Sequence, residues 1–172
     1  MASNPQADVK PLTLHAHVSG PNPHKVAIVL EFLKLPYQIR LWEFGGDFHK
    51  GVKGETFTRI NENGRVPALE DPNTGVVAWE SGAVINYLRR QYDTSNVLGP
   101  RGPTEQDRVD FEKWEYFLLT TLGPMSGQVA WFRSVLLSPF CGQSASPPKD
   151  PLITQSLGIT TRQKTKTHWI GT

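Results

Sequence analysis

Three short segments carry residue types that suit the binding of a small charged ligand. They are Ser19–Asn22, Arg65–Pro67 and Glu80–Ser81. The first offers hydrogen-bond donors for an anion, the second backbone groups beside a proline, and the third a carboxylate next to a hydroxyl. Each has an ordinary structural explanation when taken alone, so the function depends on whether the fold brings the three together.

The first segment, Ser19–Asn22, lies just before a predicted helix at residues 24–34. The N-terminus of a helix has free N–H groups and a partial positive charge, which favour an anion such as a thiolate. Ser19 and Asn22 can both donate hydrogen bonds to it. Lowering a thiol pKa by two units takes about 2.7 kcal/mol, which two donors and a helix end can supply. The alternative is that Ser19 and Asn22 only cap the helix.

The second segment centres on the Val66–Pro67 step, which precedes a short predicted strand. Such a step suggests a cis proline. It would leave the N–H and C=O of Val66 unpaired in the sheet and free to bind an extended, peptide-like ligand. The alternative is an ordinary proline at the start of a strand.

The third segment, Glu80–Ser81, opens another predicted helix. The hydroxyl and N–H of Ser81 can hold a carboxylate at the helix N-terminus, and Glu80 can pair with an ammonium group. Together they match the zwitterionic end of an amino acid. The alternative is that Ser81 caps the helix and Glu80 is merely exposed.

The elements that must position these segments can be predicted from periodicity and turn residues. A βαβ unit followed by a ββα unit is typical of a thioredoxin-like α/β fold, which would place the three segments in one cleft. Strands are expected at 12–16, 37–42, 66–70 and 76–79, helices at 24–34 and 81–92, and a helical turn at 57–61. A further helix should begin with a capping box at 104–107 and run to about 122, where Gly123–Pro124 should bend or break it.

Composition excludes several classes of protein. The formal net charge of +2 is too small to predict a nucleic-acid-binding protein. No apolar run approaches the ~18 residues of a membrane span, and the polar N-terminus predicts no signal peptide. The single cysteine, Cys141, excludes an internal disulfide and fits a reducing compartment. Because no cysteine precedes it, dithiol exchange at the first segment is excluded.

Two weaker signals come from histidines. His15 and His17 are two apart on a predicted strand, but no third metal ligand accompanies them, so no metal site is predicted. His24 lies near the first segment, where surface placement is the simpler interpretation.

The three segments together resemble a known family. The residues at 19–26, 57–69 and 80–88, which include Asn-Gly-Arg-Val-Pro-Ala-Leu and Glu-Ser-Gly-Ala-Val, resemble those of glutathione S-transferases. The similarity extends over residues 12–133 and is greatest to the fungal Ure2-like group, which includes enzymes of sulfur-containing secondary metabolism such as gliotoxin biosynthesis. It implies a thioredoxin-like domain at 1–96, followed at 97–134 by a linker and the first helix of an all-α domain.

The resemblance also implies a role for each site residue. Glutathione would be the co-substrate, and an electrophilic small molecule the second substrate. Asn22 would lie near the sulfur, with Ser19 as a second candidate. Val66 would bind the cysteinyl backbone, with Arg65 beside it. Glu80 and Ser81 would hold the γ-glutamyl end, and Lys53 would reach the glycine carboxylate.

The chain departs from the family pattern after about residue 133. Residues 135–172 hold four basic residues against one acidic residue, and 10 of these 38 are Ser or Thr. A weakly structured tail is therefore expected in place of the remaining helices, as in a truncated product. Several large side chains would then stay uncovered, namely Trp114, Tyr116, Phe117, Leu118, Trp131 and Phe132.

The implied activity is thiol activation followed by attack on the electrophile, either in detoxification or in carbon–sulfur bond formation. A second hypothesis is a catalytically incomplete glutathione-binding or regulatory module, and a third is a non-functional fragment. The family also implies a homodimer. A cytoplasmic location is expected, and neither a membrane nor a nucleic-acid partner.

Overall fold

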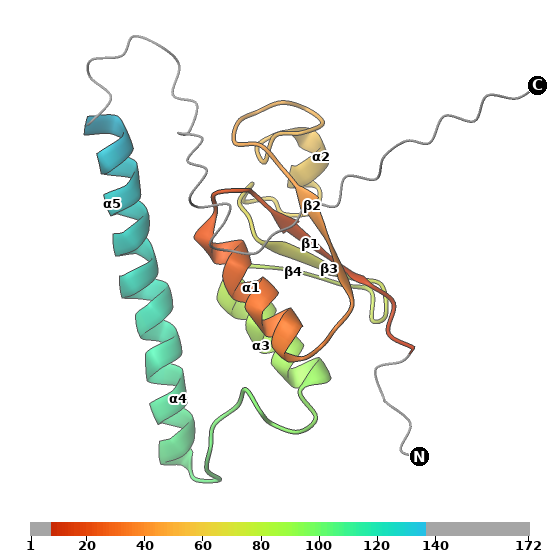
Figure 1. Ribbon diagram of the computed structural model, residues 1–172, viewed down its shortest axis with the longest axis vertical. Coiled ribbons are helices and arrows are strands. Elements are labelled where there is room, and N and C mark those ends of the chain that lie inside the picture. The colour runs from red at the N-terminus through yellow and green to blue at the C-terminus, as the bar shows by residue number, and fades with distance from the viewer. Residues whose placement is uncertain (1–7, 137–172) are drawn as a thin grey trace, which may run out of the picture. The chain divides into compact units, whose positions relative to one another are not determined.

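The computed structural model describes the backbone of residues 8–136 and the side chains of residues 8–129. It has a thioredoxin-like sheet with helices, followed by a long helical segment (Figure 1). The elements are β1 (Leu12–Ala16), α1 (Pro21–Phe32), β2 (Tyr37–Leu41), α2 (Glu55–Thr58), β3 (Ala68–Asp71), β4 (Val76–Trp79), α3 (Ser81–Tyr92), α4 (Glu105–Phe117), the π-helical turn η1 (Leu118–Leu122) and α5 (Gly123–Leu136).

The four strands form one mixed sheet in the order β2-β1-β3-β4. β1 is parallel to β2 and antiparallel to β3, and β3 is antiparallel to β4. Figure 1 shows α1 and α3 side by side on one face of this sheet. The predicted βαβ and ββα halves are therefore joined through the β1–β3 pair, and the predicted fold class is confirmed.

The main core lies between the sheet and these two helices. Alternate residues of the strands point toward it because successive side chains of a strand face opposite sides. Each buried Leu or Val contributes about 1.5–3 kcal/mol relative to an exposed one. The central members are Leu12 and Leu14 of β1, Leu69 of β3, Val26 and Leu30 of α1, and Val84 and Leu88 of α3.

A smaller core covers the opposite face and contains Trp42, Val52, Phe57 and Ala68. His15 is fully buried beside it. Its Nδ1 accepts the indole N–H of Trp42 at 2.8 Å, and its Nε2–H donates to Glu70 at 2.6 Å. Neither ring nitrogen is therefore available to a metal ion. Among residues 8–129, no group of three His, Cys, Asp or Glu side chains is placed to hold one.

Helix α1 begins three residues earlier than predicted. Pro21 and Pro23 indicated irregular structure, but α1 starts at Pro21 with Gly20 as its N-cap. Proline is tolerated in the first turn because the N–H groups there have no intrahelical partner. The prediction was wrong because it treated both prolines as helix breakers.

The prediction that Ser81 caps α3 is also wrong. The N-cap is Glu80, and Ser81 is the first residue of the helix. Glu80 has a φ of 69°, a region that non-glycine residues rarely occupy. The hydroxyl of Ser81 makes no capping hydrogen bond.

Helix α4 opens with the predicted capping box. Thr104 accepts the N–H of Asp107, whose side chain accepts the N–H of Thr104. The predicted break at Gly123–Pro124 does not occur, because the chain passes through η1 directly into α5. The wider π-helical turn accommodates the missing N–H of Pro124 without ending the helix.

Helix α4 and η1 contact α3 through specific residues. Asn86 donates to Glu115 at 2.5 Å, and the guanidinium of Arg89 lies 4.5 Å from the ring centre of Phe111. A Cβ added at Gly82 would lie 2.5 Å from Leu119. Gly82 therefore permits the close approach of α3 and η1.

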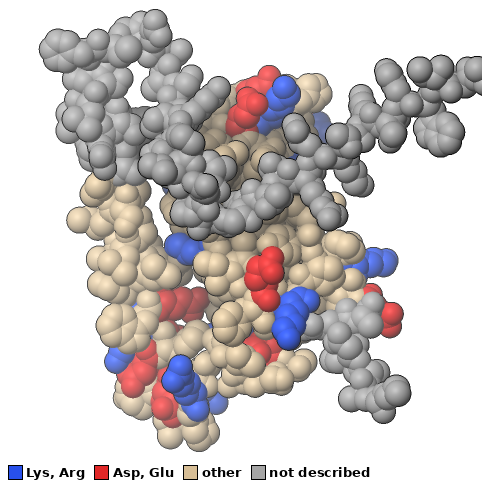
Figure 2. Space-filling view, in the orientation of Figure 1, with Lys and Arg blue, Asp and Glu red and all other residues tan. Residues whose placement is uncertain are grey.

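Helix α4 and η1 also leave large apolar side chains exposed, as predicted. They are Trp114, Tyr116, Phe117 and Leu118, whereas the side chains of Trp131 and Phe132 lie outside the described residues. Figure 2 shows charged side chains in small groups of both signs, with uncharged surface between them. Of the helices that the structure describes, none combines the length and apolarity needed to cross a bilayer. The prediction of a weakly structured tail lies, beyond residue 136, outside the described residues.

Candidate functional site

The register of the sheet brings the three predicted segments to one edge. His15 pairs with Ala68, and Ala68 pairs with Trp79. The C-terminal end of β1, the N-terminal end of β3 and the C-terminal end of β4 therefore lie side by side. The loop after β1, the residues just before β3 and the start of α3 all continue from these three positions.

The N-terminus of α1 has an unusual set of donors. Pro21 and Pro23 have no N–H, so Asn22 carries the one free N–H among the first three residues of the helix. The Asn22 side chain is exposed and has no hydrogen-bond partner within residues 8–129. His24 holds the turn by donating its Nδ1–H to the carbonyl of Gly20 at 2.7 Å. Asn22 thus presents both its N–H and its side-chain amide to a ligand.

Ser19 points to a different partner. Its hydroxyl lies 3.0 Å, and its backbone nitrogen 3.2 Å, from Nδ1 of His17. Neither Ser19 nor Asn22 caps α1. Sequence reasoning missed His17 as a partner of Ser19; the spacing of two residues was the available signal.

Val66 leaves its backbone groups accessible for binding. The Val66–Pro67 bond is cis, as the sequence suggested, and β3 begins only at Ala68. Within the described part of the chain, neither the N–H nor the C=O of Val66 has a hydrogen-bond partner. The side chain of the preceding Arg65 is exposed.

A buried asparagine holds the loop before Val66. Asn61 donates its side-chain N–H to the carbonyl of Arg65 at 2.6 Å and accepts the N–H of Asn63 at 3.0 Å. Its exposed fraction is 1%, so both polar ends of its amide are satisfied inside the protein. Sequence reasoning quoted Asn61 as part of a motif but assigned it no role.

Lys53 lies beside the same loop. Its ammonium donates to the carbonyl of Asn63 at 2.7 Å, and a Cβ added at Gly64 would lie 2.8 Å from its side chain. Gly64 has a φ of 59°, which also favours glycine. Lys53 therefore places a positive charge next to the segment that leads to Val66.

Glu80 and Ser81 complete the site at the start of α3. The Glu80 side chain is exposed, whereas Ser81 is 4% exposed and its hydroxyl has no partner among the described residues. Lys25 of α1 faces Glu80: burial lowers the pKa of Lys25, and the Glu80 carboxylate partly opposes that shift. Sequence reasoning included Lys25 in the motif at residues 19–26 but assigned it no role.

The arrangement is that of a thioredoxin-like domain with no cysteine at the start of α1 and with three segments at one edge of its sheet that carry unpaired polar groups among the described residues. Residues 10–90 match the family model "Glutathione S-transferase, N-terminal domain". The match identifies residues 10–90 as a glutathione S-transferase N-terminal domain.

Individual relatives point to Ure2-type proteins. The glutathione S-transferase-like protein OpS6 of Beauveria bassiana is 38% identical over 125 residues, which cover 73% of this chain and 54% of OpS6. One similar solved structure is the crystal structure of the glutathione transferase URE2P8 from Phanerochaete chrysosporium with oxidized glutathione. Its sequence is 33% identical to this chain, and the TM-score is 0.62. The match covers 81% of this chain and 59% of URE2P8.

A third similar structure is that of Ure2p in complex with S-p-nitrobenzylglutathione. It is 33% identical with a TM-score of 0.62, and the match covers 80% of this chain and 56% of Ure2p. The chain thus spans about half the length of the relatives it matches.

Proposed function

We propose that this chain binds reduced glutathione at the described edge of the sheet and activates its thiol for attack on an electrophilic small molecule. The observation that carries the proposal is the convergence of three segments with unused polar groups: Asn22, Val66 and Glu80–Ser81. Glutathione presents a thiol, a central amide backbone and a zwitterionic γ-glutamyl end, one group for each segment.

The γ-glutamyl end is assigned to the start of α3. The Glu80 carboxylate pairs with its ammonium group, and the hydroxyl and N–H of Ser81 bind its carboxylate. The hydroxyl of Ser81 is available because it caps no helix.

The middle of the peptide is assigned to Val66. Its N–H and C=O form two backbone hydrogen bonds with the cysteinyl residue, in the manner of an added strand. Arg65 directly precedes Val66 in sequence. Lys53 donates to the Asn63 carbonyl in the same loop and supplies a positive charge for the glycine carboxylate.

The thiol is assigned to the N-terminus of α1. The amide and N–H of Asn22, with the positive end of the α1 dipole, favour the thiolate over the thiol. The thiolate sulfur then bonds to an electrophilic carbon, whose leaving group departs with its electron pair, and the thiol proton passes to solvent. Detoxification and carbon–sulfur bond formation in secondary metabolism both use this step.

Calorimetric titration with reduced glutathione tests binding, and conjugation of 1-chloro-2,4-dinitrobenzene tests turnover. Glu80→Gln should weaken binding by roughly tenfold or more, as expected for losing a charge-assisted hydrogen bond. Glu112→Gln, on the exposed face of α4, is the matched control and should leave affinity unchanged. Equal affinities for wild type and Glu80→Gln would contradict the assignment.

The alternative is a glutathione-binding or regulatory module without turnover. One observation favours it: α4 exposes Trp114, Tyr116 and Phe117. Binding without conjugation in the same experiments would support this alternative. The domain limits at 96 and 134, the homodimer and the cytoplasmic location are further proposals that follow from the family.

A further inference from the structure

We propose that His17 determines which side chain stabilises the thiolate, by holding the hydroxyl proton of Ser19 and leaving Asn22 as the donor. The inference rests on the function proposed above. It assigns His17 a positioning role, since it acts through Ser19 rather than on the ligand.

The hydrogen bonds between Ser19 and His17 fix the state of the imidazole. The backbone N–H of Ser19 can only donate, and it lies 3.2 Å from Nδ1 of His17. Nδ1 must therefore carry a lone pair, so the proton of the neutral ring is on Nε2. The Ser19 hydroxyl, 3.0 Å from the same Nδ1, must then be a donor to it.

A serine hydroxyl has a single proton to donate. While that proton is directed to His17, Ser19 can turn only oxygen lone pairs toward the N-terminus of α1. Lone pairs do not stabilise a thiolate. The amide and N–H of Asn22 have no competing partner within residues 8–129, so Asn22 supplies the donors.

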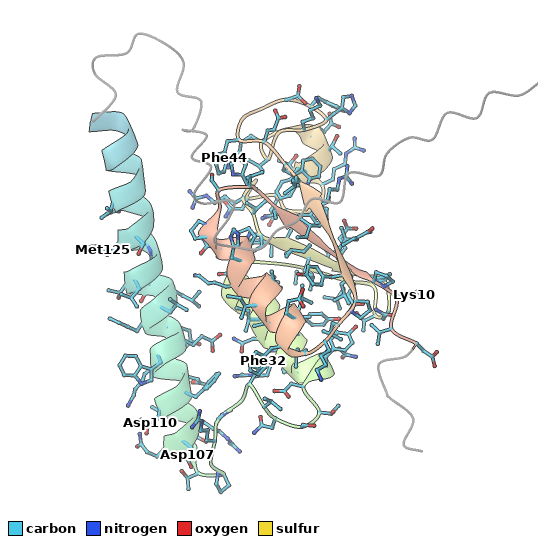
Figure 3. The ribbon with its side chains drawn as sticks, in the orientation of Figure 1. Lys10, Phe32, Phe44, Asp107, Asp110 and Met125 are labelled. Carbon is cyan, nitrogen blue, oxygen red and sulfur yellow. The ribbon has the colours of Figure 1, made fainter. Side chains whose placement is uncertain are left out.

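An aromatic contact keeps His17 in place. Its ring stacks on Phe44, with 3.7 Å between ring centres and 28° between planes. Phe44 lies in the loop that follows β2 (Figure 3). The charged group facing His17 is Glu43, whose carboxylate raises the pKa of the imidazole, but burial lowers it by more. The ring is therefore neutral near pH 7 and remains an acceptor.

The test measures the thiol pKa of bound glutathione from the ultraviolet absorbance of its thiolate. Asn22→Ala should raise this pKa by about one unit, a tenfold loss of thiolate, and Ser19→Ala should raise it by much less. His17→Phe keeps an aromatic ring on Phe44 and frees the Ser19 hydroxyl. In the His17→Phe background, Asn22→Ala should therefore lose most of its effect, and adding Ser19→Ala should restore it.

His49→Phe is the matched control, because His49 is exposed and contacts the ring of Phe48 at 4.7 Å. It should not rescue Asn22→Ala. Equal rises in thiol pKa for Ser19→Ala and Asn22→Ala, or no rescue by His17→Phe, would overturn the role of His17. Calorimetry at the same pH separates the two proposals. If the wild type binds glutathione but the variants do not show the expected thiol pKa values, only the role of His17 is overturned. If the wild type does not bind glutathione, both proposals are overturned.

A second measurement needs no variant. Nitrogen-15 NMR of the ligand-free wild-type chain reports the tautomer of His17. A proton on Nε2 supports the inference, and a proton on Nδ1 overturns it.

Discussion

Trp42 donates its indole N–H to Nδ1 of the fully buried His15, at 2.8 Å. Because an indole nitrogen only donates, the neutral ring of His15 carries its proton on Nε2, which donates to Glu70. The pair joins β1 to the residue that follows β2. In a protonated His15, the N–H at Nδ1 would face the indole N–H of Trp42, and two donors would meet. The fold therefore favours the neutral imidazole.

This relationship predicts a loss of stability on mild acidification. Burial lowers the pKa of His15 below 6.5, although the hydrogen bond to Glu70 opposes the shift. The unfolded chain therefore binds a proton that the folded chain excludes. The stabilising contribution is complete above the unfolded pKa of about 6.5 and is lost as the pH falls below it, at no more than about 1.4 kcal/mol per pH unit.

Chemical denaturation between pH 7 and pH 5 measures this effect. His15→Gln should reduce stability at pH 7 but flatten its dependence on pH in this range. His49→Gln, an exposed histidine, should keep the wild-type slope. A His15→Gln slope equal to that of wild type would show that another group titrates.

Asp71 predicts a second pH-dependent effect on stability. It is 2% exposed and accepts the hydroxyls of Tyr87 and Tyr92 and the N–H of Asn73. Burial alone would raise the pKa of Asp71, but these hydrogen bonds outweigh it and lower that pKa. Its contribution is therefore present above the unfolded pKa and is lost at more acid pH, well below the range in which His15 acts.

Asp71→Ala should lower the free energy of unfolding by about 3 kcal/mol, because it leaves two hydroxyls of α3 without their acceptor. Asp110→Ala is the control, since Asp110 forms only surface interactions on α4. This variant should change the free energy of unfolding far less than Asp71→Ala does. Equal losses for the two variants, measured by urea denaturation, would contradict the buried network.

Much of this fold follows from periodicity. The strand at 76–79 and the helix at 81–92 have the predicted limits. In both, the spacing of apolar residues along the sequence agrees with which side chains are buried. The start of α1 and the continuity through Gly123 were missed, since proline and glycine act differently in a first turn or a π-helical turn than in a helix interior.

The candidate site was predictable by residue type but not by local geometry. Asn22 and Val66 were identified because a helix start and a Val-Pro step have a recognisable chemistry. The pairing of Ser19 with His17 and the buried role of Asn61 depend on side-chain directions. Those directions are set by tertiary packing, which sequence spacing does not define.

Asn61 gives a prediction about positioning. Its amide N–H binds the Arg65 carbonyl at 2.6 Å, and its amide oxygen binds the N–H of Asn63 at 3.0 Å. Asn61→Asp keeps the acceptor and loses the donor to Arg65, so the backbone before Val66 should become less ordered. Glutathione affinity should fall by about tenfold although Asn61 is not assigned a contact with the ligand.

Calorimetry at pH 7 checks this fall, and Asn63→Ala is the control because Asn63 contributes only its backbone groups to these contacts. An Asn61→Asp variant that is folded and binds glutathione with wild-type affinity would show that this hydrogen bond does not position Val66.

Glu80 combines the proposed contact with glutathione and a strained backbone. Its φ of 69° with a ψ of 121° is a conformation that costs a non-glycine residue on the order of 1–3 kcal/mol. Glycine adopts a positive φ without that penalty, so Glu80→Gly should raise the melting temperature while weakening glutathione binding. Glu80→Gln should weaken glutathione binding to a similar extent but should not raise the melting temperature, because a glutamine side chain keeps the backbone strain at residue 80. Thermal denaturation and calorimetry on the same two variants separate these effects. If Glu80→Gly melted below Glu80→Gln, the backbone at Glu80 would not be the strained element, and the expected link between strain and binding at Glu80 would fail.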